Sequence, residues 1–260
     1  MADWNPDQYQ RFAAERRQPF DELVDLCHSV PDGTVVDYGC GPGNLTAELV
    51  DRLQAGTVVG VDNSPSMLER AEPHGHAKLR FEAGDLDAFS PDAPVDLVFS
   101  NAALHWVDDH AGVLARWRRQ LAANGQLAVQ VPTNLDHPVY AIAGEVADEF
   151  APRFAGGVPE PVVSSVLAPE AYAQILYDLG GVDLHVGLRV YCHELDTTAD
   201  AVQWIKGTSL LRYRDALDPA DYDAYEEAFT AAVVDRLGVH EPYLFTFKRI
   251  LMWARFPETG

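Results

Sequence analysis

The chain has 260 residues, a composition ordinary for a globular protein and a formal net charge of −21. This length suits one large domain or a domain with insertions, and the charge argues against nucleic acid or an anionic membrane as a partner. The sequence shows neither a signal peptide nor an apolar run long enough for a bilayer, and its three scattered cysteines favour a reducing compartment. We therefore expect a cytoplasmic protein that is a monomer or a weak homodimer.

The segment before the first predicted strand is expected to be helical. Asn5 and Pro6 suit a helix start, which gives a helix with Tyr9 on its apolar face and Arg16 further along. A second helix is expected to begin near Pro19. The segment is then either a plain helix over a sheet edge or a lid that brings aromatic and arginine side chains to a substrate.

A glycine-rich turn organises the chain. The run VVDYGCGPGN, residues 35–44, joins an apolar strand that ends at Asp37 to a helix predicted over residues 45–53. Glycine allows positive φ and a close approach of a ligand to the main chain, and the helix start offers free N–H groups. The G-x-G-x-G spacing differs from the dinucleotide fingerprint, and the G-K-[ST] of a P-loop is absent.

Four more apolar runs are predicted to be buried strands that lead to polar residues. Asp62 lies about 20 residues beyond the glycine turn, where an acid in this topology binds ribose hydroxyls; its alternative role is to cap the helix SPSMLERA. Repeated βα units predict a parallel, doubly wound sheet whose ligands bind beyond the carboxyl ends of the strands. The four runs are 57–62, ending at Asp62, 78–82, followed by Asp85, 95–99, followed by Asn101, and 125–132.

The second half of the chain has a different pattern. Helical segments are predicted near 133–168 and 199–240, and two further strands over DLHVGLRVYCHEL and YLFTFKRILMWARF. We expect one domain over residues 1–260, with lid elements near 1–26, 133–168 and 199–240.

Several motifs together carry a family resemblance. DWNP, DYGCGPGNLT, VDNSPSML, SNAALHWVDDH, QVP, QWIKGTSL and FKRILMWAR resemble the trans-aconitate methyltransferases, a family of class I S-adenosylmethionine (SAM) dependent methyltransferases. The resemblance implies SAM as the cofactor. It also implies an α/β fold with a Rossmann-like class I methyltransferase sheet of seven mostly parallel strands, a closing antiparallel hairpin and helical lid insertions.

The resemblance further implies which residues hold SAM. No metal ion is expected, because the sequence shows only isolated pairs of metal-ligating residues and no cluster. The glycine turn wraps the methionine part, the second strand end meets the ribose, the third meets the adenine, and the fourth lies beside the sulfonium. The residues concerned are Asp37, Gly39, Cys40, Gly41 and Asn44 in the turn, Asp62 and Asn63 at the ribose, Asp85 and Leu86 at the adenine, and Asn101 and Ala102 at the sulfonium.

The acceptor is expected to be a carboxylate of a small organic acid similar to trans-aconitate. A carboxylate is ionised at neutral pH and needs no general base, whereas an alcohol or phenol would need one, and His105 is the candidate catalytic residue. Arginine would bind the acid through paired hydrogen bonds. The substrate-binding candidates are Tyr9, Arg16, Trp106 and Arg212.

Two residues depart from the pattern that the resemblance implies. Leu211 stands where the family has arginine, and His105 stands where the family often has glutamine. Both changes fall on the substrate side, so two alternatives stay open. One is a SAM-dependent O-, N- or C-methyltransferase acting on a different small molecule or natural product. The other is a binding protein that kept the fold without the activity.

Overall fold

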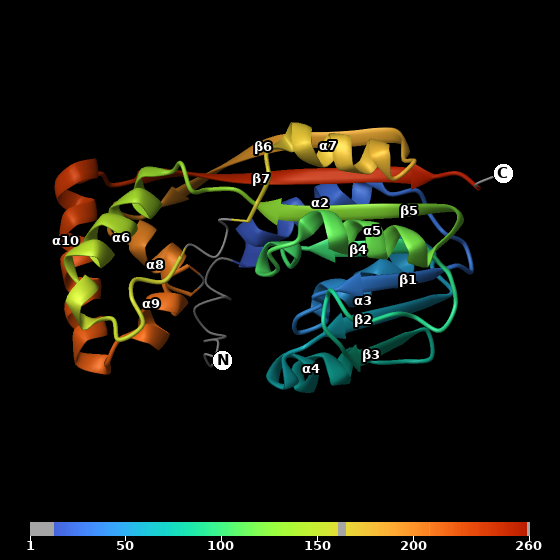
Figure 1. Cartoon of the computed structure of the whole chain (residues 1–260), viewed down its shortest axis with the longest axis horizontal. Coiled ribbons are helices and arrows are strands. Elements are labelled where there is room, and N and C mark those ends of the chain that lie inside the picture. The colour runs from blue at the N-terminus through green and yellow to red at the C-terminus, as the bar shows by residue number, and fades with distance from the viewer. Residues whose placement is uncertain (1–12, 161–164, 208, 259–260) are drawn as a thin grey trace. The chain divides into compact units, whose positions relative to one another are not determined.

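A computed structural model describes residues 13–160, 165–207 and 209–258, with side chains from residue 17 onward. Within these residues, seven strands form one sheet in the order β3-β2-β1-β4-β5-β7-β6 (Figure 1). The predicted α/β class is therefore confirmed. The strands are β1 (Thr34–Tyr38), β2 (Thr57–Asp62), β3 (Leu79–Ala83), β4 (Val95–Asn101), β5 (Leu121–Pro132), β6 (Val182–Leu195) and β7 (Tyr243–Phe256).

The sheet is parallel over its first five strands and antiparallel at its end. β1 pairs in parallel with both β2 and β4, and β4 pairs in parallel with β5. β7 then runs antiparallel to β5, with Arg249 opposite Pro132. The arrows of β6 and β7 also point in opposite directions (Figure 1). This closing antiparallel pair was predicted, and β7 is inserted between β5 and β6.

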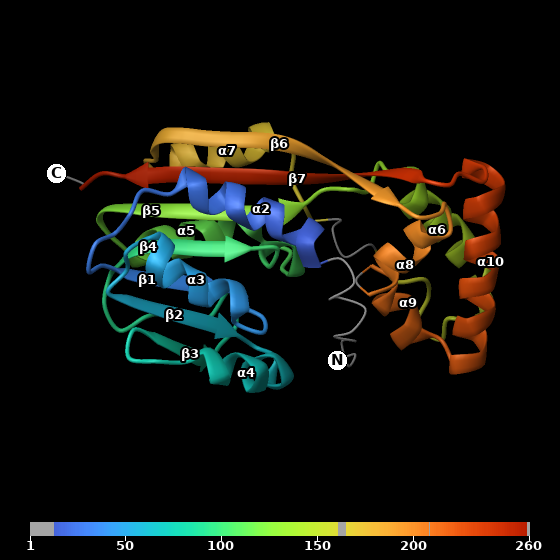
Figure 2. The ribbon, with the colours of Figure 1, turned by 180° about the vertical axis from the view of Figure 1, so that it is seen from behind.

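Helices cover both faces of this sheet. α5 and α7 lie on one face (Figure 1), and α2 and α3 lie on the other (Figure 2). Because the central strands are rich in valine and buried on both faces, they need a helical layer on each side. The helices and 3₁₀ turns are α2 (Ala13–Leu26), α3 (Asn44–Arg52), α4 (Pro65–Ala71), η1 (Glu72–His74), η2 (Leu104–Trp106), α5 (His110–Gln120), α6 (Pro138–Glu149), η3 (Ala151–Arg153), α7 (Pro169–Asp178), α8 (Asp200–Lys206), α9 (Leu211–Ala216) and α10 (Pro219–Leu237).

The predicted helix start near Pro19 is wrong, because α2 is already helical at Ala13 and continues through Pro19. Proline inside a helix removes one backbone hydrogen bond. Burial of Phe20, Leu23 and Val24 against the sheet offsets that loss. This part of the N-terminal segment is therefore a covering helix.

The chain divides into two compact units. The sheet unit comprises Arg17–Pro132, Ser165–Arg189 and Arg249–Gly260. The helical unit includes Thr133–Ser164 and Val190–Lys248 and has an aromatic core of its own around Tyr225, with Tyr213 and Phe229 among its members. The role of the helical segments as a lid stays a prediction. No helix within the described residues is long and apolar enough to span a bilayer.

Candidate functional site

The glycine turn lies at the carboxyl end of β1 and is fixed to β2. The N–H groups of Gly39 and Cys40 both donate to the carbonyl of Val61, at 2.7 and 3.1 Å. Gly39 has φ of 75°, and a Cβ added there would lie 2.1 Å from the Cβ of Ala103. The main chain after β1 therefore passes against the methyl group of Ala103, which follows β4, and only glycine permits this approach.

Gly41 meets a different environment. Its φ is 54°, and a Cβ added there would have no described atom within 4 Å. The turn therefore exposes bare main chain to open space at the carboxyl edge of the sheet, where ligands bind in this class of fold. That observation fits the methionine part of SAM, which the family resemblance places at this turn.

Asp62 ends β2 and supports the glycine turn. Its Oδ2 accepts the N–H of Gly41 at 2.9 Å, and its Oδ1 accepts the N–H of Ser64 at 2.9 Å. Ser64, and not Asp62, is the N-cap residue of α4. Each carboxylate oxygen has a second lone pair. Asp62 can therefore brace the turn and still accept hydrogen bonds from two ribose hydroxyls.

The ends of β2 and β3 are joined by side chains that the sequence assigned separately. Asn63 donates from Nδ2 to Oδ1 of Asp85 at 2.9 Å, and the N–H of Gly84 donates to the carbonyl of Asp62 at 3.1 Å. The carbonyl of Leu86 accepts the indole N–H of Trp117 at 3.0 Å. The predicted ribose and adenine residues therefore form one continuous edge.

Asp37 lies beneath the turn and is buried. Its Oδ2 accepts the hydroxyl of Thr46 at 2.6 Å. Burial raises the pKa of Asp37 to about 7, the hydroxyl of Thr46 lowers it in part, and the negative charge of Asp62 raises it further. Burial also raises the pKa of the Cys40 thiol, so Cys40 is a packing residue and not a thiolate nucleophile. Asn44 is exposed as the first residue of α3.

The end of β4 carries Asn101, Ala102 and the turn η2. Ala102 has φ of 58°, which is uncommon for a residue other than glycine, and its N–H donates to the carbonyl of Gln130 at 3.0 Å. His105 in η2 is buried, and the Nδ1 atom of its ring has no hydrogen-bond partner among the described residues. Trp106 is 55% exposed, with its ring centroid 5.1 Å from that of His105.

His105 is held in its neutral form. Burial lowers its pKa to about 3, and the positive charge of Arg249 and the proximity of His110 lower it further. A ring with such a pKa is a weak proton acceptor at neutral pH. The chemistry available at the end of β4 is therefore that of positioning and hydrogen bonding more than that of proton transfer.

The predicted substrate residues are less completely described. Tyr9 lies outside the described residues, and Arg16 is described only as backbone within α2. Arg212 lies in α9 of the helical unit, where its Nη2 donates to the hydroxyl of Tyr213 at 2.7 Å. Its guanidinium carbon is 4.4 Å from the centroid of that ring.

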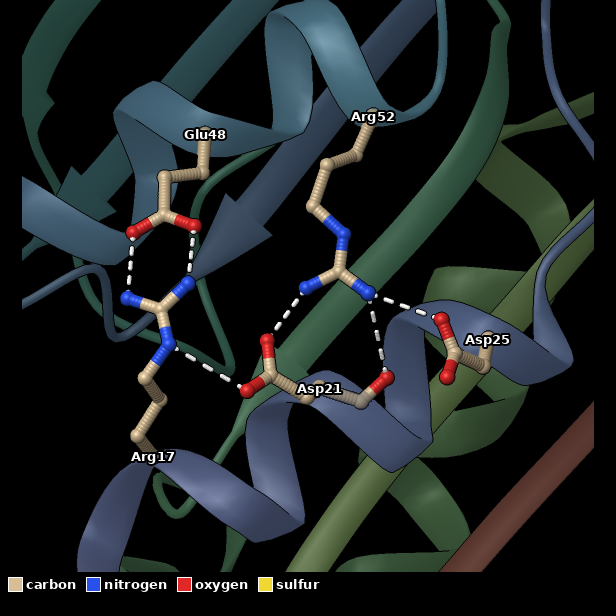
Figure 3. A network of polar contacts seen from close by, with 5 residues as sticks. All are labelled: Arg17, Asp21, Asp25, Glu48 and Arg52. Atoms are coloured by element: carbon tan, nitrogen blue, oxygen red, sulfur yellow. Dashed lines mark hydrogen bonds and ion pairs between the residues drawn. The ribbon is translucent and has the colours of Figure 1, made fainter. Parts of the chain in front are cut away.

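A network of charges ties α2 to α3, the helix that follows the glycine turn (Figure 3). Arg17 donates to both carboxylate oxygens of Glu48, at 2.8 and 2.6 Å, and pairs with Asp21 at 3.2 Å. Arg52 reaches back from α3 to Asp21 and Asp25. Arg17 is therefore engaged in structure and does not belong with the arginines available to an acid.

Three residues of the site lie within the motifs that carry the resemblance, but no role for any of them was predicted from the sequence. Thr46 is visible only as a polar residue on the buried face of a helix, and Gln130 and Arg249 only as polar residues in apolar strands. The one available signal is a polar residue at a position where the hydrophobic periodicity predicts burial. This signal singles out the three residues, but it does not identify their hydrogen-bond partners.

Comparison with known proteins identifies the family. A family model described as "Methyltransferase domain" matches residues 35–125. Trans-aconitate 2-methyltransferase from Deinococcus radiodurans is 38% identical over 98% of this chain and 99% of its own length. The protein of the same name from Streptomyces coelicolor is 37% identical over 98% of this chain and 87% of its own length.

Solved structures show the same fold at low identity. The YcgJ protein from Bacillus subtilis superposes with a TM-score of 0.62 at 16% identity, covering 94% of this chain and 100% of that chain. Phosphoethanolamine N-methyltransferase 2 from Haemonchus contortus, in complex with SAM, gives a TM-score of 0.58 at 15% identity, covering 93% and 53%. Because the curated relatives match along nearly the whole chain, this protein belongs to the trans-aconitate 2-methyltransferase family of SAM-dependent methyltransferases.

Proposed function

We propose that this enzyme methylates a carboxylate of trans-aconitate or a closely similar polycarboxylic acid, giving a methyl ester and S-adenosylhomocysteine. The observation that carries the proposal is the similarity to trans-aconitate 2-methyltransferases across both halves of the chain, including the half beyond the SAM motifs. The lowered pKa of His105 supports it, because an acceptor that is already ionised needs no base.

The proposed cofactor site uses only residues at the carboxyl edge of the sheet unit. Gly39, Cys40, Gly41 and Asn44, with Asp37 beneath them, would hold the methionine part. Asp62 and Asn63 would hold the ribose, Asp85 and Leu86 the adenine, and Asn101 and Ala102 the region of the methyl group. When bound, SAM supplies an electrophilic methyl carbon on a sulfonium.

The protein's task is to align the acceptor and exclude water. A carboxylate oxygen of the acid forms the new bond to the methyl carbon as the carbon–sulfur bond breaks, and no proton is transferred. The exposed ring of Trp106 would cover one side of the acceptor. Tyr9, Arg16 and Arg212 are proposed acid-binding residues, with Arg212 in place of the arginine that Leu211 replaces.

The test is release of S-adenosylhomocysteine with trans-aconitate and with a panel of mono-, di- and tricarboxylic acids. We expect turnover selective for trans-aconitate and a product that loses methanol in base, as an ester does. Turnover on no acid, with SAM still bound, would contradict the proposal. An alcohol or amine acceptor would then be the better candidate, and its rate would rise with pH.

We also propose a cytoplasmic location and a small-molecule partner only, in a monomer or weak homodimer. Cys27, Cys40 and Cys192, all within the described residues, are free thiols, which suits a reducing compartment. The net charge of −21 opposes both self-association and nucleic-acid binding. Sedimentation at two salt concentrations tests the oligomeric state, and a stable dimer at low salt would contradict this part of the proposal.

A further inference from the structure

A chain of hydrogen bonds crosses three neighbouring strands at the carboxyl edge of the sheet. Arg249 of β7 donates from Nη1 to Oε1 of Gln130 in β5, at 3.1 Å. Gln130 donates from Nε2 to Oδ1 of Asn101 in β4, at 2.9 Å. Gln130 is 1% exposed and Arg249 is buried, whereas Asn101 is partly exposed.

The donor chemistry of arginine fixes the direction of both amides. A guanidinium has five N–H donors and no acceptor, so Gln130 must turn its oxygen toward Arg249. The NH₂ group of Gln130 then faces Asn101, so Asn101 must accept this hydrogen bond with its side-chain oxygen. The amide nitrogen of Asn101 is thereby turned away from Gln130. A buried cation therefore determines which end of a partly exposed amide is available to a ligand.

The main chain strengthens this arrangement. The carbonyl of Gln130 accepts the N–H of Ala102, the residue with φ of 58°. Gln130 therefore holds the side chain of Asn101 and the backbone of the next residue together. One residue further on, Ala103 lies against Gly39 of the glycine turn. The direction of the Asn101 amide is therefore fixed relative to the proposed methyl site.

We propose that Arg249 and Gln130 are positioning residues that make Asn101 a hydrogen-bond donor to the carboxylate of the methyl acceptor. The inference rests on the proposed function. A carboxylate oxygen accepts hydrogen bonds only, so it suits an N–H group, whereas the ammonium group of an amine would meet the wrong end of the amide. The positive charge of Arg249 polarises both amides in the same sense and strengthens the last donor. This chain of hydrogen bonds therefore favours acids over amines as methyl acceptors.

Gln130→Glu is the decisive variant. A glutamate at this position accepts from Arg249 but cannot donate to Asn101, so the Asn101 amide turns over and presents its oxygen. We expect the dissociation constant of trans-aconitate, measured by calorimetry on protein saturated with S-adenosylhomocysteine, to rise at least tenfold. The affinity for S-adenosylhomocysteine itself should change less than threefold.

Gln126→Glu is the matched control. Gln126 is also buried in β5, four residues before Gln130, and it binds His28 and Trp253 instead of Asn101. The Gln126→Glu variant introduces the same buried carboxylate without contacting Asn101, so its affinity for trans-aconitate should stay within twofold of that of the wild type. Arg249→Lys keeps a donor to Gln130 and should weaken acid binding less than Arg249→Met.

Three outcomes would overturn the inference. They are unchanged acid affinity in folded Gln130→Glu, an equal loss in Gln126→Glu, and a parallel loss of acid and S-adenosylhomocysteine affinity. If the wild type methylates no acid, only the proposed function fails. The direction of the amides can still be tested directly, by NMR. The side-chain NH₂ of Gln130 should exchange with solvent more slowly than that of Asn101 by NMR, and Gln130→Glu should slow the exchange of Asn101. The reverse order would refute the amide direction itself.

Discussion

The N–H of Gly41 donates to Oδ2 of Asp62 at 2.9 Å, which joins the glycine turn to the acid predicted to bind ribose. A single carboxylate thus shapes the loop and, in the proposed site, would also accept hydrogen bonds from the ribose. Its loss should harm SAM binding twice, once through the missing ribose contact and once through a loosened turn.

Asp62→Ala should reduce the affinity for SAM and S-adenosylhomocysteine by about 10- to 100-fold, because hydrogen bonds to a charged group contribute about 1.5–3 kcal/mol. Asp62→Asn keeps an acceptor for Gly41 and should lose less. Calorimetric titration measures both. Asp96→Ala is the control, since Asp96 accepts the N–H of Thr34 at the other end of the sheet. Unchanged affinity in Asp62→Ala would refute the site.

Gly39→Ala and Gly41→Ala should separate stability from binding. At Gly39 the new methyl group meets Ala103 at a positive φ, which should lower the free energy of unfolding by roughly 2–4 kcal/mol. Adding Ala103→Gly should recover the part due to the clash. At Gly41 the cost is about 1 kcal/mol, from φ alone. Urea unfolding and calorimetry should find that Gly41→Ala loses mainly cofactor affinity.

Asp37 should make the ligand-free protein less stable as pH rises. Its pKa is about 7 in the folded protein against 3.8 in the reference state, so the folded state binds more protons between these values. Stability is therefore lost as pH rises from about 4 to 7. Asp37→Asn should remove this dependence and raise the melting temperature at pH 8 by several degrees.

Thr46→Val provides the opposite control for Asp37. It removes the hydroxyl that holds the pKa of Asp37 down, so the loss of stability should continue to a higher pH than in the wild type. Identical pH profiles for wild type and Asp37→Asn would contradict a buried carboxyl with a raised pKa.

His105 should be dispensable as a base. Its folded pKa of about 3 lies below the reference value of 6.5, so the folded state binds fewer protons between them. Its contribution to stability is therefore present above about pH 6.5 and is lost as pH falls toward 3. His105→Gln should keep trans-aconitate methylation within about tenfold. A limb near pH 6–7 in the kcat/KM profile that disappears in His105→Gln would instead identify a base.

The charges between α2 and α3 should contribute little and be sensitive to salt. Arg17→Ala should cost no more than about 1 kcal/mol, because its side chain is 46% exposed. Arg52→Ala should cost somewhat more, since that guanidinium is less exposed and lies 5.8 Å from the ring centroid of Phe20. Both effects should shrink in 1 M salt, and a loss that persists there would point to packing.

The strand-end residues were predictable because parallel strands meet at one edge of the sheet. Asp62 and Asp85 each follow an apolar run, and the structure brings them to adjacent strand ends, with Asn63 between them. Their ligand roles stay predictions. The continuation of α2 through Pro19 was not predictable, because proline is a local signal for a helix boundary and the burial of Phe20 is a tertiary effect.

The hydrogen bond from Arg249 to Gln130 was beyond sequence reasoning for a different reason. The two residues are 119 positions apart, and their contact exists only because β7 is inserted between β5 and β6. Periodicity predicts that a strand is buried, but it does not choose the neighbour of that strand. The two residues lie in the motifs QVP and FKRILMWAR, but only the order and register of the strands bring them into contact.

The same insertion constrains how the chain acquires its structure during synthesis. β6 emerges from the ribosome before β7, yet in the finished sheet β7 lies between β5 and β6. Until β7 (Tyr243–Phe256) has been synthesised, the edge of β5 that it pairs with lacks this partner. That edge includes the buried residues Val129 and Val131. Unpaired apolar edges attract other chains. The edge of β5 can therefore reach its final pairing only when the last strand of the sheet has been made.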